Sequence, residues 1–253
     1  MKMVKNFLGV IPARMKSTRF PGKPLAKILN IPMVQWVYEA ASKCTKLDHV
    51  VVATDSIEIF EAVKEFNGEA VMTSADCHSG LDRIIETAQK ISGFTHYVNI
   101  QGDEPMISHL TIEGVINLFY KYDYCEISTA AVYFKTMEEF QNTNNVKVVI
   151  NKNQKALYFS RSMLPNYERS GNITEYFKNN LPLKHQGIYA YSKEILSEAA
   201  SLKPCVYEKA ESLEQLRFLH NGYDIYVDIV ENESIGVDTP DDLLKVESIL
   251  KAR

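Results

Sequence analysis

Hydrophobic positions along the first hundred residues follow two alternating patterns. Four short, mostly apolar runs predict strands, and the first of them is continuously apolar, as is typical of a strand buried on both faces of a sheet: 7–11, 49–54, 70–72 and 97–100. Between them, apolar residues recur every three or four positions, which predicts three helices: 32–44, 55–66 and 82–91. Alternating strand and helix predict a doubly wound, mostly parallel α/β sheet, which binds ligands beyond the carboxyl ends of its strands.

From about Glu126 the pattern changes to apolar stretches that follow one another closely. We interpret the second half as containing five more strands, partly antiparallel: 127–134, 146–150, 156–160, 187–191 and 224–230. Helical spacing predicts two further helices, 211–220 and 241–251, whereas 165–182 is polar and irregular. We therefore expect a single domain over 1–253, with an inserted antiparallel lobe at about 130–200.

Composition indicates a soluble globular protein. Of the 253 residues, 45% are hydrophobic and 24% are charged, which excludes intrinsic disorder. No apolar run approaches the roughly 20 residues of a membrane span, so we expect no membrane insertion. The first apolar stretch is too short for a signal peptide, and the four cysteines form no C-x-x-C pair. Reduced cysteines and a cytoplasmic location are expected.

Charge is distributed unevenly along the chain. The net charge of −4 argues against a nucleic-acid binder, which would carry a basic excess. However, seven basic residues precede the first acidic residue, Glu39. This concentration of positive charge predicts a local anion-binding site near the start of the chain.

The segment 11–24, directly after the first predicted strand, carries much of that charge. Arg14, Lys16, Arg19 and Lys23 place four cations in ten residues, beside two hydroxyls and Gly22. Guanidinium groups, an ammonium group and backbone N–H groups together suit a triphosphate, although a solvated basic loop is the simpler alternative. The segment matches neither the P-loop nor the dinucleotide-binding pattern, so both of those classes are disfavoured.

Two aspartates follow predicted strands in segments far apart along the chain. Asp103 lies in 101–105, after the fourth strand and a glycine, and Asp238 lies in 236–240, before the last helix. Asp103 alone could instead cap the following helix. Together they favour one shared Mg²⁺ site, because Mg²⁺ prefers hard oxygen ligands.

These segments resemble the CMP-sugar nucleotidyltransferases over essentially the whole chain. The resemblance is carried by seven segments, in order: 11–24, 52–55, 101–105, 156–161, 185–191, 213–217 and 236–240. It implies Mg²⁺-dependent transfer of CMP from CTP to an acidic eight-carbon sugar, Kdo, for lipopolysaccharide or another bacterial surface polysaccharide. Homodimers are also implied.

The resemblance also implies roles for individual residues. The catalytic residues would be Arg14, Lys23, Asp103 and Asp238, the last two as ligands of Mg²⁺. The nucleotide would contact Pro12, Ala13, Arg14, Ser17, Lys23, Ser79, Gly80, Arg83 and Asp103. The sugar would contact Gln101, Arg161, His185, Tyr189, Glu214 and Gln215.

Several sugar-site residues have simpler interpretations. His185 precedes an apolar strand, where a histidine often serves only as a structural hydrogen-bonding group. Arg161 ends a predicted strand, where it suits a sugar carboxylate but could also pair with a surface acid. Glu214 and Gln215 lie on the predicted 211–220 helix, where either could belong to the polar face.

One segment departs from the family pattern, His-x-Ser-Gly-Thr-[Glu/Asp]-Arg. Cys77 stands at the usual histidine position and Leu81 at the usual threonine, while Ser79, Gly80 and Arg83 are kept. The segment 165–184 also lacks a tryptophan that often occurs there. These changes leave nucleotidyl transfer intact but keep a related sugar, such as the 8-amino analogue of Kdo, as an alternative substrate.

Two alternatives come from other functional classes. A glycosyltransferase of similar architecture would also use a strand-end aspartate and a metal, but the four cations of 11–24 suit a free triphosphate better than a finished nucleotide-sugar. A non-catalytic nucleotide-sugar sensor would not need both Asp103 and Asp238. Since in-line transfer needs no covalent enzyme intermediate, we predict that no serine or cysteine acts as nucleophile.

Overall fold

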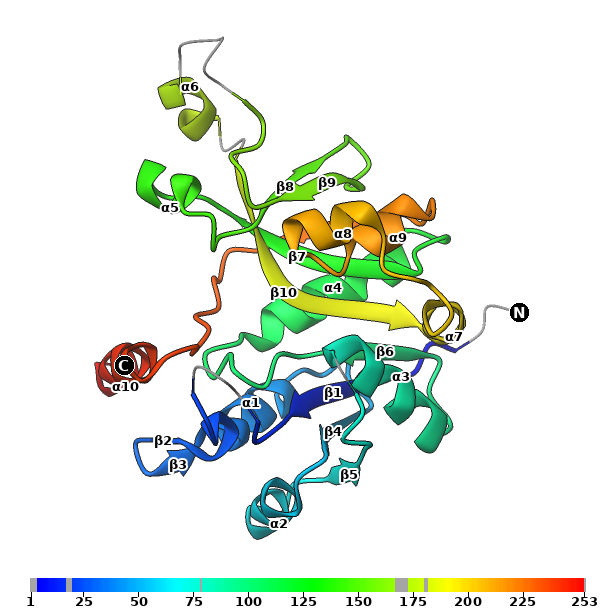
Figure 1. Cartoon of the computed structure of the whole chain (residues 1–253), viewed down its shortest axis with the longest axis vertical. Coiled ribbons are helices and arrows are strands. Elements are labelled where there is room, and N and C mark those ends of the chain that lie inside the picture. Colours follow the sequence, from blue (N-terminus) through cyan, green and yellow to red (C-terminus); the bar gives the residue numbers. More distant parts are fainter. Residues whose placement is uncertain (1–3, 17–19, 78, 167–172, 180–181, 253) are drawn as a thin grey trace.

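A computed structural model of the chain describes residues 4–16, 20–77, 79–166, 173–179 and 182–252. Within these ranges the main sheet has nine strands: β1 Phe7–Ala13, β4 His49–Thr54, β5 Ala70–Met72, β6 His96–Asn99, β7 Ile127–Tyr133, β8 Lys147–Ile150, β9 Ala156–Ser160, β10 Leu183–Ser192 and β11 Ile225–Ile229. Their order is β11-β7-β10-β6-β1-β4-β5, and β8 pairs with β10 and β9. The helices flank this twisted sheet (Figure 1).

The pairing confirms a doubly wound, mostly parallel α/β sheet. Strand β1 pairs parallel with both β4 and β6, β4 pairs parallel with β5, and β11 pairs parallel with β7. Strand β10 is antiparallel to β6 and β7, and β8 and β9 are antiparallel to their neighbours. The second half of the chain therefore adds antiparallel strands to a parallel core.

The described helices are α1 Met33–Ser42, α2 Ile57–Glu65, α3 Gly80–Lys90, α4 His109–Lys121, α5 Met137–Gln141, α6 Ile173–Lys178, α7 Lys193–Ala199, α8 Val206–Glu211, α9 Leu216–His220 and α10 Pro240–Lys251. A 3-10 turn, η1 (Lys23–Leu25), precedes the short hairpin of β2 (Lys27–Ile28) and β3 (Ile31–Pro32). None of the helices in the described ranges has the length and apolar character needed to cross a bilayer.

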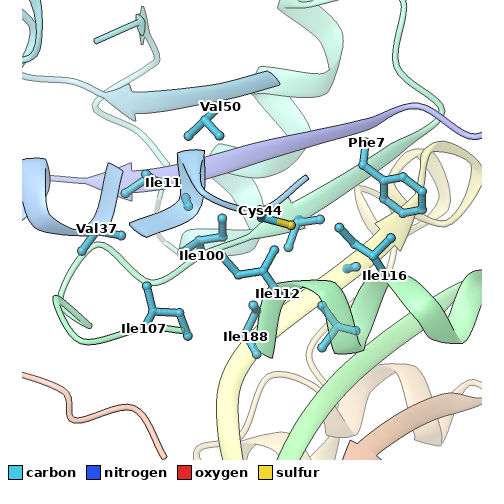
Figure 2. Close-up of a cluster of buried hydrophobic side chains, with 14 of the residues drawn as sticks. Phe7, Ile11, Val37, Cys44, Val50, Ile100, Ile107, Ile112, Ile116 and Ile188 are labelled. Carbon is cyan, nitrogen blue, oxygen red and sulfur yellow. The ribbon is translucent and has the colours of Figure 1, made fainter. Parts of the chain in front are cut away.

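Strand β1 lies at the centre of the fold because its side chains are buried on both faces of the sheet. Phe7 and Ile11 pack with α1 and α4 on one face (Figure 2), and Leu8 and Val10 pack with α3 and α7 on the other. Side chains of a strand alternate between faces, so a continuous apolar run is what this position requires. Burial of each side chain of this size stabilises the fold by about 2 kcal/mol. The loop that follows β1 therefore starts from a firmly held strand.

A third, smaller apolar cluster attaches α10 to the β2–β3 hairpin. Its buried members are Ile28, Met33, Val237 and Val246. In Figure 1 α10 lies beside this hairpin, away from the antiparallel strands β8 and β9. This packing brings the segment before α10 to the carboxyl edge of the parallel strands.

The predicted 211–220 helix is wrong in one respect. Helix α9 begins only at Leu216, because α8 ends at Glu211 and Ser212 adopts a left-handed conformation with φ of 52°. Glu214 and Gln215 therefore lie in a turn and not on the polar face of a continuous helix. Hydrophobic spacing does not predict helices α4 and α7; α4 is buried over most of its surface, including Thr111, and so lacks a clear polar face.

Candidate active site

A cleft of about 230 Å³ opens at the carboxyl ends of β1 and β6. Its lining comes from three regions, namely the loop after β1, the start of α3 and the segment after β6, together with one residue before α10. The residues are Pro12, Ala13, Arg14, Lys23, Pro24, Cys77, Ser79, Gly80, Arg83, Gln101, Gly102, Asp103 and Asp238. Most residues expected to bind the nucleotide thus share one cavity; Ser17 lies outside the described residues.

Lys23 occupies the centre of the charged part of this cleft. Its Nζ lies 2.6 Å from Asp103 Oδ2 and 3.4 Å from Asp238 Oδ1, and its side chain is only 13% exposed. Gly22 N donates to Met15 O at 3.1 Å. The φ of Gly22 is 71°, a left-handed conformation that is unfavourable for residues with a side chain. This turn directs Lys23 back toward the sheet, while Arg14 is exposed at the mouth of the loop.

Asp103 and Asp238 are held together by the backbone as well as by Lys23. Val237 N donates to Asp103 O at 2.8 Å, which joins the segment after β6 to the segment before α10. Thr239 then caps α10, with its Oγ1 accepting from Asp242 N. Two carboxylates remote in sequence therefore face one cavity, as the sequence pattern predicts.

Gly102 is required here by a close approach of two backbone segments. A Cβ atom at this position would lie 2.5 Å from Pro12 O, well inside contact distance. The loop after β6 can therefore lie against the end of β1 only with glycine at this position. This contact sets the position of the neighbouring Asp103.

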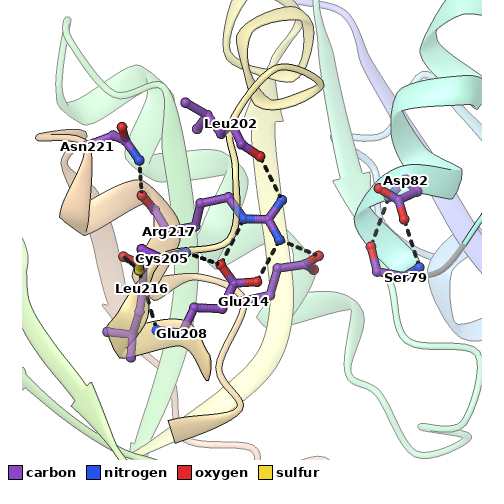
Figure 3. Close-up of polar contacts among 9 residues, drawn as sticks. All are labelled: Ser79, Asp82, Leu202, Cys205, Glu208, Glu214, Leu216, Arg217 and Asn221. Carbon is purple, nitrogen blue, oxygen red and sulfur yellow. Dashed lines mark hydrogen bonds and ion pairs between the residues drawn. The ribbon is translucent and has the colours of Figure 1, made fainter. Parts of the chain in front are cut away.

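The start of α3 forms a second wall of the cleft. Ser79 Oγ accepts from Asp82 N at 3.2 Å, and Asp82 Oδ2 accepts from Ser79 N at 2.9 Å, which makes a capping box (Figure 3). Arg83 is buried, donates to Thr73 Oγ1 and lies 3.5 Å from Asp55 Oδ1. Its guanidinium charge is therefore partly compensated within the protein.

Cys77 lines the cleft as a thiol. Burial raises its pKa to about 11, with further contributions from its hydrogen bond to Glu86 and the charge of that carboxylate. The reactive thiolate form is thus scarce at neutral pH. This agrees with a transfer that uses no cysteine nucleophile.

Several residues expected to bind the sugar gather beside the cleft around β10. Gln101 Nε2 donates to Gly187 O at 2.9 Å, which links the cleft to this strand. The His185 ring lies 5.3 Å from that of Tyr189, centroid to centroid, and burial lowers the pKa of His185 to about 3. Gln215 is buried, and its Nε2 has no hydrogen-bond partner among the described residues.

Glu214 extends from the turn between α8 and α9. Burial raises the pKa of its carboxyl group, and a hydrogen bond from Ser79 acts in the opposite direction. Arg217 anchors the same turn through two bonds to Glu208, at 2.9 and 2.6 Å (Figure 3). Glu214 therefore connects the sugar-site residues to the cap of α3.

Arg161 does not line the cleft. Its Nε donates to Glu211 O at 2.8 Å, and its terminal nitrogens donate to Thr143 O at 3.2 Å and Ser212 O at 3.5 Å. The guanidinium group therefore holds backbone carbonyls in this state of the protein. Contact with a sugar carboxylate would require it to exchange some of these partners.

Sequence reasoning assigned no role to Glu104 beside Asp103. Burial, together with the charge of Asp103, raises the pKa of Glu104 to about 7. The sequence signal that could have identified Glu104 is its position next to Asp103 in 101–105. Thr129, in β7, also contacts the sugar-site residues but carries no recognisable sequence signal.

The donor set of the cleft fits Mg²⁺. Asp103 and Asp238 offer two carboxylates, and the Lys23 ammonium between them shows that a cation is accommodated there. The described residues contain no group of three or more acidic, histidine or cysteine ligands. Mg²⁺ typically takes one or two carboxylates and completes its shell with water and substrate phosphates.

A doubly wound sheet with a cationic loop and paired strand-end carboxylates around one cleft defines a nucleotidyltransferase. The cytidylyltransferase family model matches residues 8–229. The chain belongs to the cytidylyltransferase family.

Similar proteins match nearly the whole chain. The chain is 47% identical to the 3-deoxy-manno-octulosonate cytidylyltransferase of Parabacteroides distasonis, covering 98% of this chain and 99% of that protein. It is 45% identical to the enzyme of the same name from Leptospira interrogans, covering 99% and 98%.

Solved structures agree with this assignment. The structure of CMP:2-keto-3-deoxy-manno-octonic acid synthetase complexed with CTP superposes with a TM-score of 0.91 at 38% identity, covering 98% of this chain and 99% of that chain. The 4-diphosphocytidyl-2C-methyl-D-erythritol synthase of Anaerococcus prevotii shares the fold, with a TM-score of 0.62 at 15% identity.

Proposed function

We propose that this protein transfers CMP from CTP to the anomeric hydroxyl of Kdo, giving CMP-Kdo and pyrophosphate for lipopolysaccharide biosynthesis. The observation that carries the proposal is the cluster of Lys23, Asp103 and Asp238 in one cleft, next to the loop that carries Arg14. The similarity of the whole chain to a synthetase whose structure was solved with CTP supports CTP as the nucleotide substrate here.

The reaction requires in-line attack on the α-phosphorus of CTP. A bond forms from the sugar oxygen to phosphorus while the bond to pyrophosphate breaks, so negative charge develops on phosphate oxygens. Arg14 and Lys23 supply the positive charge that stabilises these oxygens. Pro12 and Ala13, at the end of β1, and Ser79, Gly80 and Arg83, at the start of α3, bind the rest of the nucleotide.

Asp103 and Asp238 would hold Mg²⁺ beside the triphosphate. When bound, this ion neutralises phosphate charge and lowers the pKa of the attacking hydroxyl. Both carboxylates are partly exposed, at 35% and 49%, so they remain open to the cleft. With CTP bound, the Lys23 ammonium would interact with triphosphate oxygens in place of Asp103 and Asp238.

The polar residues around β10 would bind the sugar. Gln101 joins this region to the cleft, and the unpartnered Gln215 Nε2 offers a donor for a hydroxyl or carboxylate oxygen. His185, Tyr189, Glu214 and Arg161 complete the proposed set. Arg161 would reach the sugar carboxylate after giving up carbonyl partners on the 211–212 turn.

We place the reaction in the cytoplasm and expect a homodimer. All four cysteines are free, which fits a reducing compartment. The added antiparallel segment exposes apolar side chains, with Leu157 61% and Tyr133 37% exposed, and these favour a surface for a second copy. Light scattering that gives twice the 28.8 kDa chain mass would support the dimer, and the single mass would contradict it.

A substrate panel tests the reaction. Pyrophosphate release would be measured with CTP, UTP, ATP or GTP, each combined with Kdo, its 8-amino analogue or a sialic acid. We expect release only with CTP and Kdo, abolished by a chelator and restored by Mg²⁺. Preference for the 8-amino analogue would change the sugar assignment. Release from CTP without any sugar, or turnover of a finished nucleotide-sugar alone, would overturn the proposal.

A further inference from the structure

Thr129 lies fully buried where the pairing of β10 with β7 is irregular. The register shifts between Gln186 and Tyr189, so two carbonyl oxygens of β10 reach the Thr129 side chain. Its Oγ1 lies 2.6 Å from Ile188 O and 3.3 Å from Gln186 O. The same oxygen lies 3.0 Å from His185 Nε2.

Counting protons at this hydroxyl decides which group donates. A threonine hydroxyl has one proton, and the two carbonyl oxygens can only accept. The shortest of the three distances is to Ile188 O, so that carbonyl takes the proton of Thr129. His185 Nε2 then faces an oxygen lone pair, and the contact is a hydrogen bond only if Nε2 carries a proton.

The protonation state of the other ring nitrogen of His185, Nδ1, follows from this contact. Burial lowers the pKa of His185 to about 3, so the ring is neutral near pH 7 and has one N–H. With that proton on Nε2, Nδ1 is an acceptor. His185 is half-buried, and its ring makes a hydrogen bond within the described ranges only through Nε2.

We propose that Thr129 is a positioning residue that fixes His185 in its Nε2–H tautomer and so presents Nδ1 as an acceptor for a sugar hydroxyl. This proposal rests on the proposed function for the identity of the ligand. The ring contacts of His185 fit this role, since Phe159 and Tyr189 lie 5.0 and 5.3 Å away between ring centroids and limit its rotation.

The test uses three variants on one strand. Thr129→Val keeps the side-chain shape and removes the hydroxyl, whereas Thr129→Ser restores it. Ser128→Ala is the matched control, because Ser128 is equally buried but donates to Val115 O at 2.8 Å on the other face of the sheet. Thermal unfolding of all variants checks that they are folded.

Two measurements are needed. Nitrogen-15 NMR of labelled histidine separates N–H-bearing from bare ring nitrogens, with the His185 signals assigned by comparison with His185→Gln. Steady-state kinetics then gives KM for the sugar and for CTP. The NMR measurement needs no sugar, so it tests the tautomer even if the substrate panel contradicts the proposed function.

We expect a bare Nδ1 in the wild type, in Thr129→Ser and in Ser128→Ala, and a mixture of tautomers in Thr129→Val. Thr129→Val should raise KM for Kdo roughly tenfold, as expected for one lost hydrogen bond, and leave KM for CTP within about twofold. A protonated Nδ1 in the wild type would overturn the proposal. An unchanged tautomer in Thr129→Val, or an equal rise in KM in Ser128→Ala, would also do so.

Discussion

Replacing Gly102 with alanine should inactivate the enzyme while leaving most of the fold intact. The added Cβ would lie 2.5 Å from Pro12 O, and its next neighbours lie at 3.5 Å. An ordinary contact between such atoms is about 3.4 Å or more. The two backbone segments must therefore separate by roughly 1 Å, because neither is a flexible side chain.

That displacement acts directly on Asp103, the next residue. A misplacement of about 1 Å at a catalytic group costs about a hundredfold in rate. We therefore expect kcat to fall by about two orders of magnitude, with a loss of stability of about 1–3 kcal/mol from overpacking. Binding of CTP alone should weaken less than turnover, because β1, from which the loop with Arg14 starts, is buried on both faces and the segment after β6 is expected to move instead.

Gly236→Ala is the matched control, because Gly236 lies two residues before Asp238 and a Cβ there would meet nothing within 4 Å. Pyrophosphate release with CTP and Kdo gives kcat, and urea unfolding gives stability. We expect Gly236→Ala to keep activity within about twofold. The steric reasoning would be refuted if Gly102→Ala kept comparable activity, or if both variants lost the same amount.

Three further outcomes follow from the site and the core. Asp103→Asn should nearly abolish turnover without changing the unfolding midpoint; ordinary turnover would remove Asp103 from the metal site. Arg161→Ala should raise KM for Kdo much more than KM for CTP, whereas equal effects would place Arg161 outside the sugar site. The ring of His96 stacks on that of Phe7 at 4.6 Å between centroids, and burial lowers the pKa of His96 to about 4. Between pH 6.5 and 4 the unfolded chain therefore binds a proton that the folded chain does not bind. The free energy of unfolding falls in this range as pH decreases. Relative to His96→Phe, the wild type should lose about 2 kcal/mol between pH 7 and 4.5 in urea unfolding, and a constant difference would contradict the shift.

The parallel half of the fold was predictable because its signals are local. Continuous apolar runs mark strands buried on both faces, and β4 and β5 have the predicted bounds. The same pattern missed α4, since a helix packed between β7, β11 and α1 needs no polar face. It also started α9 too early, at Glu211, because a left-handed Ser212 leaves no mark in hydrophobic spacing.

The site was predictable where residue type limits the chemistry. Cations in a loop and acids after strands led to Lys23, Asp103 and Asp238, which the structure places in one cleft. Features that depend on three-dimensional contact were not predictable. The contact of Gly102 with Pro12, the carbonyl partners of Arg161 and the hydroxyl of Thr129 beside His185 all depend on how remote segments meet.

The backbone hydrogen bond from Val237 N to Asp103 O makes the activity depend on whether the segment before α10 stays packed against the segment after β6. Helix α10 is attached through a small apolar cluster in which Val246 is its buried residue, so it is a weakly held element that can open before the main sheet. When it detaches, Asp238 leaves and the carboxylate pair no longer exists, although the central strands are still paired. On gradual heating, inactivation should therefore precede the cooperative melting of the protein.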